Sequence, residues 1–222
     1  MFFSNMSHEI RTPLTAIVGF SSLLTSETEL DKETRCQCGD VIRFNSELLL
    51  KLINDVIDFS SLEENEMDFH FCSHDAVFVC RNVLETVEHV KKSNAHLKFI
   101  TKLGSLMLVT DVNRLQQVLI NLLINATKFT KEGTITLELA LTKDGVALFS
   151  VADTGCGIPL EKQKQIFERF EKLDEYIQGS GLGLSICQSI VERIGGKIWI
   201  DPLYTEGAKF VFTHPLTQTP EA

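Results

Sequence analysis

The first sixty residues carry apolar side chains at helical spacing, and one copy of the chain has nothing to cover them. In the first stretch these side chains recur every three, four or seven residues, at Ile10, Leu14, Ile17 and Leu24. After a polar break at residues 25–31, the same periodicity returns at Val41, Leu48, Leu52, Val56 and Phe59. Two such helices form a hairpin that cannot enclose its own apolar stripe. Pairing two hairpins into a four-helix bundle buries the stripe, so the sequence predicts a homodimer.

From about residue 68 the pattern changes to alternating strand-like and helix-like segments. The strand-like segments are residues 69–72, 98–103, 134–141, 146–152, 197–201 and 209–213, and the helix-like segments are residues 76–90, 111–128 and 182–194. This order predicts an α+β fold, an α/β sandwich with helices on one face of a mixed sheet. The charged stretch at residues 63–68 is typical of a domain boundary. We therefore expect a helical domain over 1–66, a second domain over 67–217 and a tail over 218–222.

Composition excludes several classes of protein. A net charge of -9 argues against a protein that binds nucleic acid through its phosphates. The longest apolar runs fall short of the roughly 20 residues that span a bilayer, so we expect no direct membrane contact in this chain. The six cysteines include no Cys-x-x-Cys pair, which favours unpaired thiols in a reducing compartment. The chain is predicted to be soluble and cytoplasmic.

The first helix contains the motif SHEIRTPL at residues 7–14. A lone histidine on a helix is usually a solvated surface residue, but its neighbours here are informative. Thr12 lies four residues after His8 and shares its helix face. Neutral imidazole is a good nucleophile, and the carboxylate of Glu9 is near enough to polarise it or take its proton. The motif therefore indicates a nucleophilic histidine.

A second motif, DVNRLQQVLINLLINATKF at residues 111–129, places a polar stripe on an apolar helix. Its members are Gln117, Asn121, Asn125 and Lys128. The stripe could be a simple solvent face, although such faces favour Glu and Lys. Neutral carboxamides suit a site that binds Mg²⁺ and phosphate oxygens without adding negative charge, and a lysine supplies a phosphate counter-charge.

Two glycine clusters form the third feature, DTGCGIP at residues 153–159 and GSGLGLSI at residues 179–186. Glycines let the backbone approach a ligand closely and adopt positive φ. The second cluster leads directly into a helix, whose free N–H groups and dipole favour phosphate. Neither cluster is a Walker loop, because no Gly-Lys-Ser/Thr follows. Asp153, at the end of a strand, is suited to accept a hydrogen bond from an exocyclic amine.

Together these motifs resemble the sensor histidine kinases, in the right order and over essentially the whole chain. SHEIRTPL is similar to the phosphoacceptor box of that family. The resemblance implies that His8 is the residue phosphorylated, that Glu9 is the acid–base carboxylate and that Thr12 assists a phosphatase reaction.

The other boxes imply the nucleotide site. NLLINATKF resembles the asparagine box, in which Asn121 would hold Mg²⁺ while Asn125 and Lys128 contact nucleotide. DTGCGIP resembles the first glycine box, with Asp153 reading the adenine amino group. IFERFEKLD resembles the phenylalanine box beside a mobile lid, and GSGLGL resembles the second glycine box at the phosphates. The remaining residues implied in binding are Gly155, Gly157, Phe170, Gly179, Ser180, Gly181, Leu182 and Gly183.

The resemblance implies an ATP-dependent protein-histidine kinase with Mg²⁺ as cofactor. Its dimeric hairpin would be followed by an ATP-binding domain of the gyrase and MutL type. The phosphoryl group would pass to an aspartate of a response regulator receiver domain, and the longer parent would be membrane-anchored. Two departures stand out: the segment between Phe170 and Gly179 is short and acidic, and Ala208 stands where the family often has threonine. The missing hydroxyl predicts modest nucleotide affinity.

Two alternatives remain open on the sequence alone. An ATPase of the same fold without histidine chemistry would also have the boxes from Asn121 to Gly183, but it would not account for SHEIRTPL on a dimerising hairpin. The second alternative is a catalytically weak dimer that acts as a phosphatase or scaffold.

Overall fold

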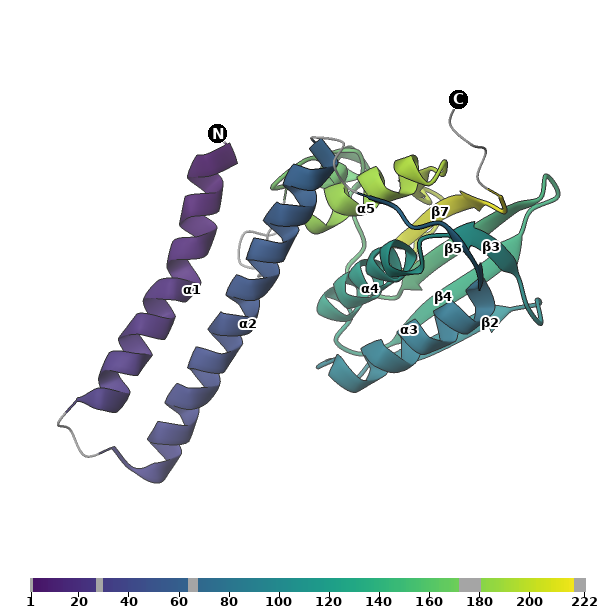
Figure 1. The fold of residues 1–222 in the computed structure, drawn as a ribbon. Coiled ribbons are helices and arrows are strands. Elements are labelled where there is room, and N and C mark those ends of the chain that lie inside the picture. Colours follow the sequence, from purple (N-terminus) through teal and green to yellow (C-terminus); the bar gives the residue numbers. More distant parts are fainter. Residues whose placement is uncertain (1, 27–29, 64–67, 172–180, 218–222) are drawn as a thin grey trace.

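The computed structural model describes residues 2–26, 30–63, 68–171 and 181–217. Helices α1 (Phe2–Thr25) and α2 (Lys32–Glu63) run antiparallel as a hairpin (Figure 1). Asp31 precedes α2, and its carboxylate accepts a hydrogen bond from the N–H of Thr34 at 2.6 Å. The predicted helical hairpin is confirmed. Among the described helices, none is long and apolar enough to cross a membrane.

Several large apolar side chains of the hairpin stay in contact with water in the single chain, Leu14 of the predicted stripe among them. Leu50 is 62% exposed and Val18 is 57% exposed. Other large apolar side chains of the hairpin that remain exposed are Leu14, Leu23, Phe44, Ile53 and Ile57. A patch of this kind is typical of an interaction surface.

The second domain is built on a five-stranded mixed sheet. Its strand order is β2-β4-β5-β7-β6, with β2 parallel to β4 and the other pairs antiparallel. The strands are β2 (His96–Thr101), β4 (Thr134–Leu141), β5 (Val146–Asp153), β6 (Ile198–Ile200) and β7 (Lys209–Pro215). Helices α3 (Ala76–Val90), α4 (Val112–Phe129) and α5 (Gly183–Arg193) cover one face of this sheet (Figure 1). The predicted fold class is confirmed.

Period-two burial along the strands creates the core. Ile135, Leu137 and Leu139 of β4 are buried, whereas the residues between them are only partly buried. Phe149 of β5 lies opposite Phe212 of β7, and their rings stack with centroids 4.7 Å apart. The buried faces of α3, α4 and α5 pack on this layer in one cluster.

An aspartate cap fixes where α4 begins. Asp111 precedes α4, and its Oδ1 accepts hydrogen bonds from the N–H groups of Asn113 and Arg114 at 2.9 and 3.2 Å. Its Oδ2 accepts a third, from the N–H of His70 at 3.0 Å. One carboxylate thus sets the start of α4 and ties it to the segment that enters the domain.

The short strands differ from expectation. The first strand is β1 (Cys72–Asp75), not residues 69–72, because it pairs antiparallel with β3 (Met107–Thr110). Segment 107–110 was not predicted as a strand. Such short strands owe their limits to a partner distant in the sequence, which local periodicity does not reveal.

The hairpin and the second domain meet along α2, which lies between α1 and that domain (Figure 1). The Asp58 carboxylate on α2 accepts hydrogen bonds from Arg114 Nη1 at 3.0 Å and Gln117 Nε2 at 2.7 Å. Arg114 Nη1 also donates to Gln117 Oε1 at 2.9 Å. We call these three residues the Asp58 clamp. Next to it, Leu52 is buried at 4% exposure and Val56 packs against the core of the second domain.

Candidate active site

The proposed nucleophile lies on the hairpin. His8 is exposed on α1, and Glu9 beside it is half-buried. The hydroxyl of Thr12 donates a hydrogen bond to the backbone carbonyl of His8 at 3.3 Å. His8 and Thr12 are therefore on adjoining turns of one helix, as predicted. An exposed imidazole is open to a reaction partner that approaches α1 from outside.

Helix α4 supplies the polar side chains of the second motif. Asn121 is half-buried, and its Nδ2 donates to the carbonyl of Gly183 at 2.9 Å, which joins α4 to the first residue of α5. A Cβ on Gly183 would lie within 3.0 Å of both terminal atoms of the Asn121 carboxamide. Glycine at this position is what lets the two helices approach. The carboxamide oxygen has no hydrogen bond within the described residues.

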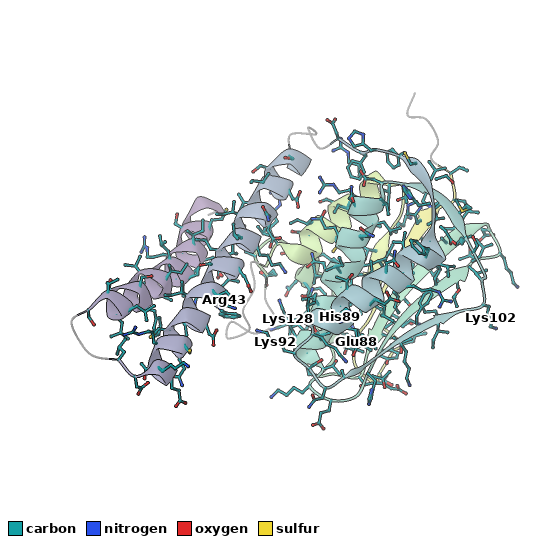
Figure 2. The ribbon with its side chains drawn as sticks, turned by 60° about the horizontal axis from the view of Figure 1, so that its bottom comes forward. Arg43, Glu88, His89, Lys92, Lys102 and Lys128 are labelled. Carbon is teal, nitrogen blue, oxygen red and sulfur yellow. The ribbon has the colours of Figure 1, made fainter. Side chains whose placement is uncertain are left out.

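Asn125 is half-buried one turn further along α4, and Lys128 is exposed near its end. Lys128 lines a pocket of about 480 Å³ formed by residues 92–94, 127, 128, 131 and 132. Figure 2 shows Lys128 and Lys92 on the side of the domain that faces α2. The ammonium of Lys92 lies 5.0 Å from the ring centroid of Phe44 on α2, a second contact between the domains.

The first member of the predicted stripe lies in a different environment. Gln117 does not join Asn121 at the glycine turn, because its carboxamide is hydrogen-bonded within the Asp58 clamp. Of the four stripe residues, Gln117 serves the contact between the domains.

Asp153 is the buried carboxylate of the site, 3% exposed at the end of β5. Its Oδ1 accepts hydrogen bonds from the N–H of Gly155 at 2.9 Å and the N–H of Ala208 at 3.3 Å. Burial raises the pKa of Asp153, while these two N–H groups and the hydroxyl of Thr130 act to lower it. No hydrogen bond from the described residues reaches Oδ2. One oxygen is thus anchored and the other is available to a donor from a ligand.

The first glycine cluster shapes the backbone around this carboxylate. A Cβ on Gly155 would lie 2.4 Å from the carbonyl oxygen of Phe129, so no larger residue fits there. Gly157 has a φ of +70° and packs against Gly207. The loop therefore lies flat against the end of α4 and the start of β7.

The second glycine cluster meets the phenylalanine motif. The N–H of Phe170 donates to the carbonyl of Gly181 at 3.0 Å. Both residues have positive φ, 64° at Phe170 and 67° at Gly181, and a Cβ on Gly181 would lie 2.6 Å from the Cα of Phe170. Leu182 is buried in the core directly before α5. Gly179 and Ser180, and the acidic segment before them, lie outside the described residues.

These residues are brought together from four segments. The ends of β5 and α4, the loop before β7 and the glycine turn that begins α5 surround one region. It offers a buried acceptor at Asp153 and an amide at Asn121. The N–H groups at the start of α5 add an end suited to phosphate. An adenine nucleotide fits this set of groups.

Two features were not found from the sequence. The Asp58 clamp joins residues 56 and 59 positions apart, and nothing in local periodicity pairs Asp58 with α4. Thr130 reads as the polar end of a helix, yet it is buried beside Asp153. The only available sign was its place directly after the second motif.

Two family models match the chain. Residues 1–65 match the His Kinase A (phospho-acceptor) domain. Residues 110–218 match the histidine kinase-, DNA gyrase B-, and HSP90-like ATPase. The first match, on the segment that contains His8, distinguishes this chain from an ATPase of the same fold without a phosphoacceptor domain.

Curated relatives agree with the family models. Sensor histidine kinase GacS of Pseudomonas protegens is 34% identical over 98% of this chain and 25% of its own length. Circadian input-output histidine kinase CikA of Synechococcus elongatus is 36% identical over 96% of this chain and 29% of its own. Autoinducer 2 sensor kinase/phosphatase LuxQ of Vibrio parahaemolyticus is 33% identical over 97% of this chain and 26% of its own length. The chain thus spans about a quarter of the length of these relatives.

Solved structures of histidine kinases are also similar to this chain. Histidine kinase ThkA in complex with response regulator protein TrrA has a TM-score of 0.77 at 30% identity, covering 99% of this chain and 62% of that one. Full-length ShkA in complex with AMPPNP has a TM-score of 0.71 at 30% identity, covering 97% of this chain and 46% of the ShkA chain. The catalytic domain of ThkA has a TM-score of 0.60 at 33% identity, covering 67% of this chain and 97% of the ThkA domain. The chain therefore belongs to the histidine kinase family, with a phosphoacceptor domain followed by an ATP-binding domain.

Proposed function

We propose that this chain is the catalytic core of a two-component sensor histidine kinase. It transfers the γ-phosphoryl group of ATP to His8 and then to an aspartate of a response regulator receiver domain. The observation that carries the proposal is the combination, in one chain, of an exposed histidine on an incompletely covered hairpin with a buried carboxylate and glycine turns suited to ATP.

The proposed chemistry at the hairpin is nucleophilic. A ring nitrogen of His8 forms a bond to the γ-phosphorus while the bond between that phosphorus and the bridging oxygen of ADP breaks. Glu9, the next residue, takes the proton that the imidazole loses. The exposure of His8 supports this role, because an in-line approach needs an open face on α1.

The residues of the ATP domain fit an adenine nucleotide. Asp153 has an oxygen free for the adenine amino group, and Gly155 and Gly157 let the base approach the backbone. Gly181, Leu182 and Gly183, with Gly179 and Ser180 before them, would bind the phosphates at the start of α5. Phe170 holds this turn through Gly181, and Asn125 and Lys128, further along α4, would contact the same ligand.

Magnesium fits the amide at Asn121. The Nδ2 of Asn121 donates a hydrogen bond to the carbonyl of Gly183, so the Asn121 carboxamide oxygen would be the metal ligand. Bound Mg²⁺ would neutralise charge on the phosphates during transfer. Asn121 would hold the ion without adding the negative charge that a carboxylate brings.

The partners follow from the two domains. The exposed apolar side chains of α1 and α2 support a homodimer through residues 1–66, with residues 67–217 as the ATP-binding unit and 218–222 as a tail. The complex of ThkA with TrrA supports a response regulator as the acceptor. We place this portion in the cytoplasm and propose a membrane anchor in a longer parent. We also propose a phosphatase activity through Thr12, which the kinase/phosphatase LuxQ among the relatives supports.

A labelling experiment tests the central proposal. His8→Gln should abolish acid-labile, alkali-stable label from γ-labelled ATP and Mg²⁺ while ATP affinity stays within about twofold, because His8 is on another domain. His89→Gln is the matched control, an exposed histidine at the end of α3 that should label normally. Persistent acid-labile label in His8→Gln would refute the assignment.

A further inference from the structure

A buried hydroxyl lies beside the carboxylate of the proposed adenine site. Ala208, where the family often has threonine, contributes only backbone to Asp153: its N–H donates to Oδ1 at 3.3 Å, and its carbonyl accepts from the N–H of Asp153 at 2.9 Å. A hydroxyl beside the carboxylate comes from another segment. It belongs to Thr130, the capping residue directly after α4.

The Thr130 hydroxyl is buried and unpaired. Thr130 is 1% exposed, and its Oγ1 has no hydrogen-bond partner within the described residues. Its backbone N–H is already used, because it donates to the carbonyl of Ala126 at 3.0 Å. A buried hydroxyl without a partner is unfavourable, so its retention calls for an explanation.

The surroundings of this hydroxyl point to Asp153. A Cβ on Gly155 would lie 2.9 Å from Thr130 Oγ1, and the N–H of Gly155 donates to Asp153 Oδ1 at 2.9 Å. Gly155 therefore touches both groups. The hydroxyl is also near enough to the carboxylate to lower the pKa of Asp153, against burial, which raises it. The hydroxyl of Thr154 lies instead against Gly133 at the start of β4, where it accepts a hydrogen bond from the N–H of Thr134 at 3.0 Å.

We propose that Thr130 is a positioning residue of the adenine site, whose hydroxyl donates a hydrogen bond to the Asp153 carboxylate when nucleotide binds. The bond keeps the carboxylate ionised and aims its second oxygen at the amino group of adenine. Thr130 thus takes the place of the hydroxyl that Ala208 lacks. The inference rests on the proposed binding of ATP at Asp153.

The charges around Asp153 allow a pH test. Tyr204, on the loop between β6 and β7, has its pKa raised by burial first and then by the negative charges of Glu206 and Asp153. Tyrosine titrates near 10, well above the range in which a carboxylate loses its charge. The loss of ATP selectivity on acidification would therefore report Asp153.

The experiment compares ATP with GTP by calorimetric titration from pH 5 to 8. The two nucleotides share the triphosphate, so the ratio of their affinities isolates the base, and guanine has a carbonyl where adenine has the amino group. Thr130→Val should lower the ATP-to-GTP ratio about fivefold to tenfold and move its decline to higher pH, since a hydrogen bond to a charged acceptor is lost. Thr130→Ser should stay within about twofold of wild type.

Thr127→Val is the matched control. It removes a hydroxyl from the same helix that already donates to the carbonyl of Ile124 at 2.8 Å, and its ratio should not change. An equal loss of ATP and GTP affinity in Thr130→Val, or failure of Thr130→Ser to restore the ratio, would assign a merely structural role and overturn the inference. A selective wild type with an unchanged Thr130→Val ratio overturns this inference alone. A wild type that does not bind ATP overturns the proposed function as well.

Discussion

Substitution of Gly181 by alanine tests the turn that joins Phe170 to α5. Alanine at a φ of 67° costs about 1–2 kcal/mol. The new methyl group would also lie 2.6 Å from the Cα and 2.8 Å from the carbonyl carbon of Phe170, and these backbone atoms cannot rotate away. Overpacking of this kind adds about 1–3 kcal/mol, so the turn is disfavoured by about 2–5 kcal/mol in all. If the turn opens to relieve the strain, even a 2 kcal/mol penalty on closing it around ATP lowers the affinity about 30-fold.

Gly145→Ala is the matched control for this change. Gly145 has a similar φ of +73°, but it lies in the turn between β4 and β5, with no atom within 4 Å of the added Cβ. It should show the backbone penalty of about 1–2 kcal/mol without the clash and leave ATP affinity unchanged. Titration calorimetry with Mg²⁺ and thermal unfolding measure both effects. If Gly181→Ala matches Gly145→Ala in ATP affinity and in melting temperature, the close approach does not shape the nucleotide site.

Three further predictions concern other parts of the chain. Asp58→Asn should leave ATP affinity within about twofold but weaken the contact with Arg114 by about 1–2 kcal/mol, seen as a larger radius of gyration in X-ray scattering; an unchanged radius would contradict it. Burial lowers the pKa of His214 below 6.5, so its neutral form, bonded to Thr110 at 2.9 Å, contributes stability above about pH 6.5 that is lost as pH falls toward the folded pKa. Urea unfolding between pH 7.5 and 5.5 should show this slope in wild type and a smaller slope in His214→Asn. Thr12→Ala should keep self-labelling and slow dephosphorylation of a phosphorylated regulator, and equal rates in a phosphate-release assay would exclude that role.

The long helices and central strands were predictable because their burial follows local periodicity. In β4, buried and half-buried residues alternate as the sequence indicates, and the capping aspartate Asp111 comes directly before α4. The side of a helix on which a given polar residue lies is harder to predict. A step of four residues advances about 40° around the axis, so Gln117 and Asn125 differ by about 80° although both seem to continue one stripe.

Contacts between segments far apart in the sequence could not be predicted, for a different reason. The burial of Thr130 depends on the close approach of Gly155, and the pairing of Asp58 with Gln117 depends on how two domains dock. Neither has a repeating local pattern. The candidate residues themselves were predictable from their motifs, but the partners that orient them were not.

The position of α2 has a kinetic consequence. Within one chain this helix separates α1, which carries His8, from the ATP domain held by the Asp58 clamp (Figure 1). Labelling of His8 by its own subunit then requires the clamp to open, and the rate is the chemical rate multiplied by the fraction of open molecules. A clamp worth about 1.4 kcal/mol makes that fraction about one in ten. Any ligand or upstream segment that pulls on α2 would change the labelling rate by altering this fraction, without touching a catalytic residue.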